Sequence, residues 1–296
     1  MPSLKEVRIR IASVKSTRQI TSAMKMVSAS KLRRAQNAIL TMRPYSSKLM
    51  HIMQDLSHDL EGSDEGVYGN DRGEHKVLLV PITSNRGLCG AFNTNVVKET
   101  INLINGRFSA QWKSGDVELF CLGKKGADSL KSAGYEPTRV NIEIFDALTF
   151  ENVVAIAEGL MAEFVAKKYD KIILVYNQFK NAAVQILQTE QFLPVSEDKS
   201  DKKEEEQESQ ANYIFEPGKK EILEALVPKS IKVQLFKALL DSFAAEHGAR
   251  MTAMHKATEN ADELLKQLNL SYNKARQAAI TNEILEIVGG AEALNA

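Results

Sequence analysis

The stretch that decides the fold is residues 228–288, PKSIKVQLFKALLDSFAAEHGARMTAMHKATENADELLKQLNLSYNKARQAAITNEILEIV. After Pro228 it contains no further proline and one glycine, Gly248, before the pair Gly289–Gly290. Proline suits the first position of a helix and glycine its end, so the sequence predicts one helix from Pro228 to the glycine pair. At 1.5 Å per residue such a helix is about 90 Å long, too long for a small domain to bury. It therefore needs a partner helix.

Residues in this helix recur at alternating steps of four and three, the spacing of a coiled-coil seam. Eleven of the sixteen seam positions are apolar, which predicts a seam much longer than a usual helix. The positions are Phe236, Leu240, Phe243, His247, Arg250, Met254, Ala257, Ala261, Leu264, Leu268, Ser271, Ala275, Ala278, Asn282, Leu285 and Gly289.

Residues 3–58 are predicted to form the partner helix. They contain no glycine and one proline, Pro44, which allows a bend near Arg43. The same spacing passes through Leu4, Val7, Ile11, Val14, Arg18, Thr21, Lys25, Ser28, Leu32, Ala35, Ile39 and Met42. Both ends of this seam are apolar, but its middle is polar or small. We therefore expect the middle to face something other than the partner helix.

Positive charge is concentrated in this first helix, although the whole chain has a formal net charge of zero. Before Asp55 the helix contains only one acidic residue, Glu6, but eleven lysines and arginines: Lys5, Arg8, Arg10, Lys15, Arg18, Lys25, Lys31, Arg33, Arg34, Arg43 and Lys48. A basic helix of this kind can contact nucleic acid, an anionic membrane or an acidic protein surface. It can also be a solvated face without a partner.

The middle of the chain has a different pattern, in which strands alternate with helices. After a linker at 59–75, strands are predicted at 76–83, 117–123, 139–145, 171–179 and 183–195, and helices at 94–108, 124–134 and 151–169. This order favours a Rossmann-like α/β domain with a largely parallel sheet, whose last two strands can form a hairpin through Lys180–Asn181. Residues 196–210 carry seven acids and no apolar residue, which is typical of a disordered loop. Residues 212–226 are predicted as a short strand and a short helix.

The predicted fold class is therefore α/β plus a long antiparallel coiled coil. The N- and C-terminal helices pair, and the α/β domain is inserted between them. The predicted boundaries are 1–60 for the first coiled-coil helix, 76–195 for the α/β domain, 196–210 for the acidic loop, 211–227 for a return segment and 228–296 for the second coiled-coil helix.

No catalytic, cofactor or metal site is predicted. The turn TSNRGLCGAFN (83–93) has neither the GxxxxGK[ST] nor the GxGxxG spacing of nucleotide-binding loops. Cys89 would need a base to act as a nucleophile, and no histidine of the sequence has a recognisable relation to it. Cys89 and Cys121, the only cysteines, are expected to be reduced thiols. No apolar run approaches the roughly 20 residues that span a bilayer, and the N-terminus lacks the apolar core of a signal peptide.

Three blocks of the sequence resemble the gamma-subunit family of F-type ATP synthases: SLKEVRIRIASVKSTRQITSAMKMVSASKLRRAQ (3–36), ARMTAMHKATENADELLKQLNLSYNKARQAAITNEILEIVGGAEAL (249–294) and TSNRGLCGAFN. The resemblance covers essentially the whole chain. It implies a non-catalytic rotor stalk whose end helices pass through a ring of alternating alpha and beta subunits. The α/β domain would lie at the foot, next to the epsilon subunit and the membrane ring of c subunits. The implied role is to couple ion-driven rotation of that ring to conformational cycling of the beta subunits, peripherally at the cytoplasmic face of a bacterial membrane.

The resemblance also implies contact residues. Met24, in SAMKMV, matches the family methionine that faces the torque-transmitting loops of the beta subunit. The matching positions of the C-terminal helix are Arg250, Arg276, Gln277, Thr281 and Glu283, and those that meet the c ring are Tyr213 and Glu216. Two departures stand out: the loop at 196–210 is longer and more charged than is typical, and the regulatory cysteine insertion of the chloroplast branch is absent.

Two other functions remain open from the residues alone. One is a nucleic-acid-binding coiled coil that uses the basic N-terminal helix, for which steeply salt-dependent DNA binding is expected. The other is a small enzyme that uses Cys89 in its glycine turn.

Overall fold

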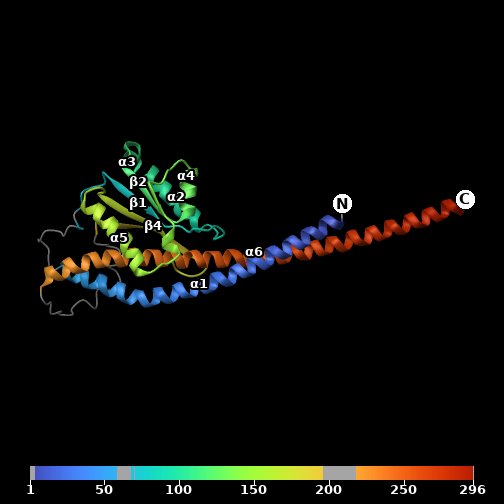
Figure 1. Cartoon of the computed structure of the whole chain (residues 1–296), viewed down its shortest axis with the longest axis horizontal. Helices are drawn as coiled ribbons and strands as arrows, with labels where there is room; N and C mark the ends of the chain where they lie inside the picture. The colour runs from blue at the N-terminus through green and yellow to red at the C-terminus, as the bar shows by residue number, and fades with distance from the viewer. Residues whose placement is uncertain (1–3, 59–67, 70, 196–217, 296) are drawn as a thin grey trace. The chain divides into compact units, whose positions relative to one another are not determined.

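The computed structural model describes residues 4–58, 68–69, 71–195 and 218–295. The chain divides into two compact units, one made of residues 1–29 and 250–296 and the other of residues 30–249. Two long helices, α1 (Leu4–His58) and α6 (Lys219–Asn295), contribute to both units (Figure 1). The other elements all lie in the second unit, which is called the sheet unit below; the first is called the helix-pair unit.

Helix α6 is longer than the sequence predicts. It has 77 residues, about 115 Å at 1.5 Å per residue, and it continues through both Pro228 and the Gly289–Gly290 pair. The expected start at Pro228 and stop at the glycines were therefore wrong. A proline removes one helical hydrogen bond, but packing of the following turns against the sheet, through Ile231 and Leu235, offsets that loss. The glycines do not adopt the positive φ that ends a helix.

The sheet has five strands in the order β3-β2-β1-β4-β5. The strands are β1 (Val77–Pro81), β2 (Val117–Leu122), β3 (Arg139–Asn141), β4 (Lys171–Phe179) and β5 (Gln185–Leu193). The first four are parallel and β5 is antiparallel to β4, so the predicted hairpin is confirmed. Strand β3 covers only part of the predicted strand 139–145, because the chain turns into a 3-10 helix, η1 (Glu143–Phe145).

Helices cover both faces of this sheet. On one face lie α2 (Phe92–Asn105) and α4 (Lys124–Ser132), preceded by the short α3 (Ser109–Ser114); on the other lies α5 (Phe150–Val165) (Figure 1). The predicted helix 94–108 ends early because the chain leaves the helix at Gly106. Residues Ile231, Leu235, Ala238 and Leu239 of α6 belong to the same core as α5. The first part of α6 is thus a layer of the sheet unit, which the sequence did not reveal.

A close approach between α4 and the end of β1 depends on two glycines. Gly123 has φ 112°, and a Cβ added there would lie 2.2 Å from the carbonyl oxygen of Thr83. The backbone N–H of Gly126 donates to the Oγ1 of Thr83 at 2.9 Å. Neither position tolerates a side chain, so the carboxyl edge of the sheet is tightly fitted here.

The two long helices of the helix-pair unit run antiparallel. As the residue number on α1 rises from Arg8 through Arg18 to Lys25, its partner on α6 falls from Tyr272 through Asp262 to His255. The predicted class, an α/β unit with a long antiparallel helix pair, is confirmed. No helix in the described part of the chain is both long enough and apolar enough to cross a membrane.

Candidate interaction surfaces

A polar layer lies in the middle of the helix-pair unit. Arg18 forms an ion pair with Asp262, the hydroxyl of Thr258 donates to that of Thr21 at 2.9 Å, and the Nζ of Lys25 lies 3.2 Å from the Nδ1 of His255. The polar middle of the α1 seam therefore faces α6, and the expectation that it faces something else was wrong. The physical reason is that α6 supplies matching polar groups at the same levels.

Burial of the hydroxyls in this layer is tolerated because each has a hydrogen-bond partner. Thr21 is 8% exposed and also donates to the carbonyl of Arg18 at 3.1 Å, and Ser28 is 2% exposed and donates to the carbonyl of Met24 at 2.8 Å. The Arg18–Asp262 pair is nearly half exposed on both sides. Exposed ion pairs contribute about 0–1 kcal/mol to stability. The layer therefore serves mainly to bring matching polar groups of the two helices to the same level, and it adds little to the free energy of unfolding.

The seam changes position beyond Leu268. Tyr272, and not the predicted Ser271, faces α1: the Nη2 of Arg8 donates to its hydroxyl at 2.9 Å, and the Arg8 guanidinium lies 5.8 Å from the ring centre. The hydrogen bond from Arg8 lowers the pKa of Tyr272. Arg8, Arg18 and Lys25 thus all engage α6, which leaves fewer positive charges for an outside partner than the sequence indicated.

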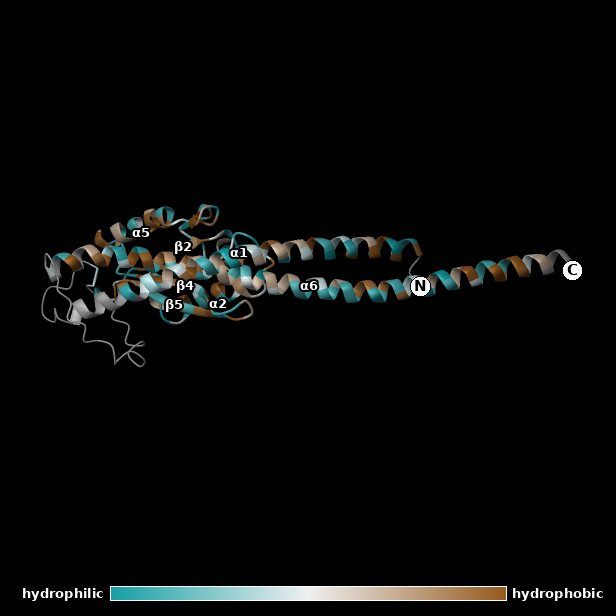
Figure 2. Ribbon diagram, turned by 90° about the horizontal axis from the view of Figure 1, so that it is seen from below, coloured by the Kyte–Doolittle hydropathy of each residue, from teal (hydrophilic) through white to brown (hydrophobic). Residues whose placement is uncertain are grey.

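The turns of α6 at residues 281–291 are exposed to solvent. Every residue from 281 to 291 is exposed, including the predicted seam positions Asn282, Leu285 and Gly289, so the seam does not reach them. Arg8 of α1 pairs with Tyr272 of α6. Leu4, where α1 starts, lies about one turn before Arg8, and because the helices are antiparallel it is level with α6 near Arg276. Figure 2 shows apolar segments in this part of α6 beyond the end of α1. The large apolar residues are Ile280, Ile284, Leu285, Ile287 and Val288, each 48–71% exposed.

The contact residues expected from the family resemblance occupy different environments. Arg276, Gln277, Thr281 and Glu283 are exposed, with the Thr281 hydroxyl donating to the carbonyl of Gln277 at 2.9 Å. Met24 is half-buried. Arg250 is only 6% exposed, so most of its side chain is covered within this chain. Tyr213 and Glu216 lie outside the described residues. The roles of all these residues remain predictions.

The exposed apolar residues near the end of α6 were not predicted from the sequence. The sequence contains the apolar residues Ile284, Leu285, Ile287 and Val288 close together, but the alternating four-and-three spacing placed Leu285 in the seam. Assigning seam positions by this spacing assumes that a partner helix runs beside the whole of α6. The part of α1 that the structure describes does not extend as far as Leu285.

The glycine-containing turn after β1 is held by its own side chains. The Nδ2 of Asn93 lies 3.2 Å from the Sγ of Cys89, and the Oδ1 of Asn93 accepts from the backbone N–H of Ser84 at 3.0 Å. The Ser84 hydroxyl donates to the carbonyl of Arg86 at 2.6 Å. Cys89 is 1% exposed. These contacts account for the turn as a structural feature.

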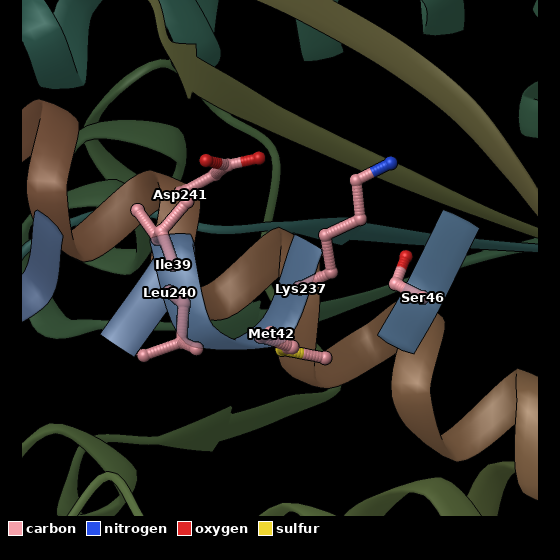
Figure 3. A pocket seen from close by; sticks show the side chains of 6 residues that line it. All are labelled: Ile39, Met42, Ser46, Lys237, Leu240 and Asp241. Atoms are coloured by element: carbon pink, nitrogen blue, oxygen red, sulfur yellow. The ribbon is translucent and has the colours of Figure 1, made fainter. Parts of the chain in front are cut away.

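A small hollow lies between α1 and α6 within the sheet unit (Figure 3). Its volume is about 230 Å³ and includes space open to solvent. Its lining is formed by Ile39, Met42, Ser46, Lys237, Leu240 and Asp241. Figure 3 shows the Lys237 ammonium and the Asp241 carboxylate on the same side of α6. No group of three or more metal-ligating side chains occurs in the described residues.

These features define a class of protein in which a long helix pair is joined to an α/β unit and the prominent surfaces suit contacts with other chains. Comparisons with known proteins agree. The family described as ATP synthase matches residues 3–294. The ATP synthase gamma chains of Flavobacterium johnsoniae and Cytophaga hutchinsonii are 60% and 51% identical, each over all of both chains.

Two solved structures are also similar. The first is of the central stalk and c-ring of the Tetrahymena thermophila mitochondrial ATP synthase; the matching chain is 26% identical with a TM-score of 0.58, covering 80% of this chain and 99% of that one. The other, of the Euglena gracilis mitochondrial ATP synthase, has a TM-score of 0.67 at 23% identity and covers 98% and 94%; it supports the fold alone. The chain belongs to the gamma-chain family of ATP synthases, the gamma subunits of the central stalk.

Proposed function

We propose that this chain is the non-catalytic rotor subunit that couples ion-driven rotation of a c ring to the conformational cycle of catalytic beta subunits. The observation that carries the proposal is the continuity of α6. One unbroken helix packs into the core of the sheet unit through Ile231, Leu235 and Leu239 and continues to exposed apolar residues as far as Val288. A torque applied to the sheet unit is carried by the covalent helix itself.

The sheet unit holds the first part of α6 through contacts on two different elements. Lys232 of α6 pairs with Glu158 of α5 at 2.6 Å, and the Gln234 amide donates to Glu190 of β5 at 2.6 Å. Leu235 and Leu239 fill the core between them. Because polar contacts on both sides flank an apolar core, the helix cannot turn on the sheet without breaking all three. This is what a coupling element requires.

The proposed partners are the alpha and beta subunits around the helix pair, and the epsilon subunit and c ring at the sheet unit. The proposed location is the cytoplasmic face of a bacterial membrane, reached through these partners. We retain the five sequence boundaries as proposed functional segments, although helix α6 begins at Lys219, inside the proposed return segment 211–227. The nucleic-acid alternative loses support, because Arg8, Arg18 and Lys25 face α6.

Reconstitution tests the proposal. The purified chain is expected to hydrolyse no ATP, whereas its addition to alpha and beta subunits is expected to produce a stable three-subunit ATPase. Full activity of the alpha–beta mixture without bound gamma chain would refute it. Duplex-DNA binding at low salt, measured in parallel, checks the alternative.

The double substitution Arg276→Ala with Gln277→Ala tests the expected torque contacts. Both side chains are exposed, so the chain is expected to fold as before. Loss of their directional hydrogen bonds to partner carboxylates is expected to lower steady-state ATP turnover or assembly several-fold. Thr281→Ala is a milder comparison, because its hydroxyl is engaged by its own helix. Unchanged turnover and assembly would exclude Arg276 and Gln277 as torque contacts.

A further inference from the structure

Helix α6 meets the tip of the β4–β5 hairpin near the end of the sheet unit. Gly248 of α6 is buried, and a Cβ added there would lie 3.2 Å from both the Cα and the carbonyl oxygen of Ala182 and 3.5 Å from the ring of Phe179. These distances are short enough that even a methyl group would require the hairpin to move by a few tenths of an ångström. We call the approach of Gly248 to Phe179 and Ala182 the hairpin contact.

The tip of the hairpin is held in shape by its own hydrogen bonds. The Oδ1 of Asn181 accepts from the backbone N–H groups of Ala183 and Val184 at 2.9 and 2.7 Å, a common arrangement in turns. The N–H of Asn181 donates to the carbonyl of Val184 at 3.2 Å. Asn181, Ala183 and Val184 are exposed, whereas Ala182 is partly buried. The tip therefore presents Ala182 to α6, and its internal hydrogen bonds resist displacement.

The glycine determines which side of α6 faces the hairpin. Successive residues of an α-helix point about 100° apart, so turning α6 about its axis would bring His247 or Ala249 towards Ala182. Both residues have a Cβ, and His247 has a ring as well, so neither fits the close approach that Gly248 makes. The hairpin contact is therefore compatible with one rotational setting of α6.

Other contacts hold α6 at an earlier level of the helix. There the Gln234 amide donates to Glu190 at 2.6 Å, and Glu190 also accepts from the hydroxyl of the buried Tyr176 at 2.6 Å. Gly248 lies about 21 Å further along the helix, at 1.5 Å per residue. Contacts at two separated levels resist both tilting and twisting of a helix, whereas contacts at one level leave it free to tilt.

We propose that Gly248 is a positioning residue for torque transfer, which holds α6 in one rotational setting on the sheet unit through the hairpin contact. The proposal rests on the proposed function and assigns part of it to a single residue. If α6 turned within the sheet unit, part of the rotation imposed there would be lost before it reached the rest of the helix. ATP hydrolysis would then continue with less ion transport for each ATP.

Matched substitutions at two helical glycines test this role. Gly159 of α5 is exposed, and a Cβ added there would meet nothing within 4 Å. The whole ATP synthase complex carrying Gly248→Leu or Gly159→Leu is reconstituted into lipid vesicles, which are then separated from unbound complexes. ATP hydrolysis and the membrane potential that it builds are measured on the same vesicles, the latter with a potential-sensitive dye. The dye reports transport of protons and of sodium ions alike.

Gly248→Leu is expected to lower the rate of potential build-up per ATP hydrolysed at least about twofold, because the leucine displaces the hairpin. Gly159→Leu is expected to leave this ratio unchanged, since its side chain extends into solvent. Gly248→Ala, which displaces the hairpin least, is expected to keep most of the ratio. A purely structural role would lower hydrolysis and transport together and would leave the ratio as it is.

Amide hydrogen exchange locates the structural change. In Gly248→Leu the N–H groups of Ala183 and Val184 are expected to exchange faster, whereas those of β1 keep their protection. A lower ratio without faster exchange in the hairpin would place the effect elsewhere and would overturn the hairpin contact as its cause.

The outcomes distinguish the two proposals. Coupled transport by the unaltered complex, with equal ratios for Gly248→Leu and Gly159→Leu, overturns the positioning role and leaves the rotor function standing. Absence of coupled transport with the unaltered chain overturns the rotor function and the positioning role with it. If Gly248→Leu does not assemble, Gly248→Val replaces it with the same expectation. Failure of both variants to assemble would show that Gly248 serves only the fold, and would also overturn the positioning role.

Discussion

Strand β1 is buried along its whole length and packs on both faces, whereas the helices of the helix-pair unit touch along one narrow seam. In the sheet unit, side chains such as Leu78 and Leu235 are completely buried, and a glycine is required where α4 meets Thr83. In the helix-pair unit, most residues from 4 to 29 stay partly or fully exposed. The contrast shows that one region is organised for tight packing and the other for contact with its surroundings.

The same contrast appears in the polar groups. Buried polar contacts of the sheet unit include the bond from the Tyr176 hydroxyl to Glu190 at 2.6 Å, and burial raises the pKa of Tyr176 strongly. The ion pair of the helix pair, Arg18–Asp262, is close to half exposed. Interactions in water are weaker and more readily exchanged. We therefore expect substitutions in the sheet unit to affect stability much more than those in the helix pair.

The largest effect is expected for Gly123→Ala. Its Cβ would lie 2.2 Å from the Thr83 oxygen at a positive φ, so the substitution combines a clash with strain and is expected to destabilise the sheet unit by about 3 kcal/mol or more. Fluorescence of Trp112, the single tryptophan, reports unfolding of this unit in urea. Gly115→Ala is the control: it has φ 83° and open space around it, so only about 1 kcal/mol is expected. Equal losses would contradict the close packing.

The next largest effect on the free energy of unfolding is expected when one leucine from each region is replaced by alanine. Leu235→Ala removes a fully buried side chain from the sheet unit and is expected to cost about 2–5 kcal/mol. Leu264→Ala removes a partly exposed seam residue, for which about 1 kcal/mol is expected because less apolar area returns to water. Urea unfolding followed by Trp112 fluorescence and by far-UV circular dichroism measures both. A larger loss for Leu264→Ala would reverse the comparison.

The smallest effect is expected for Arg18→Ala. Its ion pair with Asp262 is exposed, so the free energy of unfolding is expected to fall by less than about 1 kcal/mol. The difference from the unaltered chain should shrink as salt is added, because exposed charges are screened. Thermal unfolding at low and high salt tests this. A salt-independent loss of several kcal/mol would mean that the polar layer is a main source of stability.

Much of the architecture was predictable from local patterns. Buried strands read as continuous apolar runs because helices cover both faces, and the two long helices read as stretches with very few glycines and prolines. The antiparallel pairing followed from two long helices at opposite ends of the chain. The candidate contacts were predictable only from the family resemblance, since Arg276 and Gln277 have no local pattern that separates them from other exposed helix residues.

What the sequence by itself determined is most of the elements of the α/β unit and the two long helices, because helix and strand depend on periods of 3.6 and two residues within a short stretch. What only the tertiary structure decided is which faces meet. Because α6 packs on the sheet, the helix continues through Pro228. Asp262 and Thr258 pair with the polar middle of α1, which makes that middle part of the seam. The side chain of Arg250 is buried instead of exposed. These outcomes depend on residues far apart in the chain, whose contacts form only when the helices and the sheet pack together.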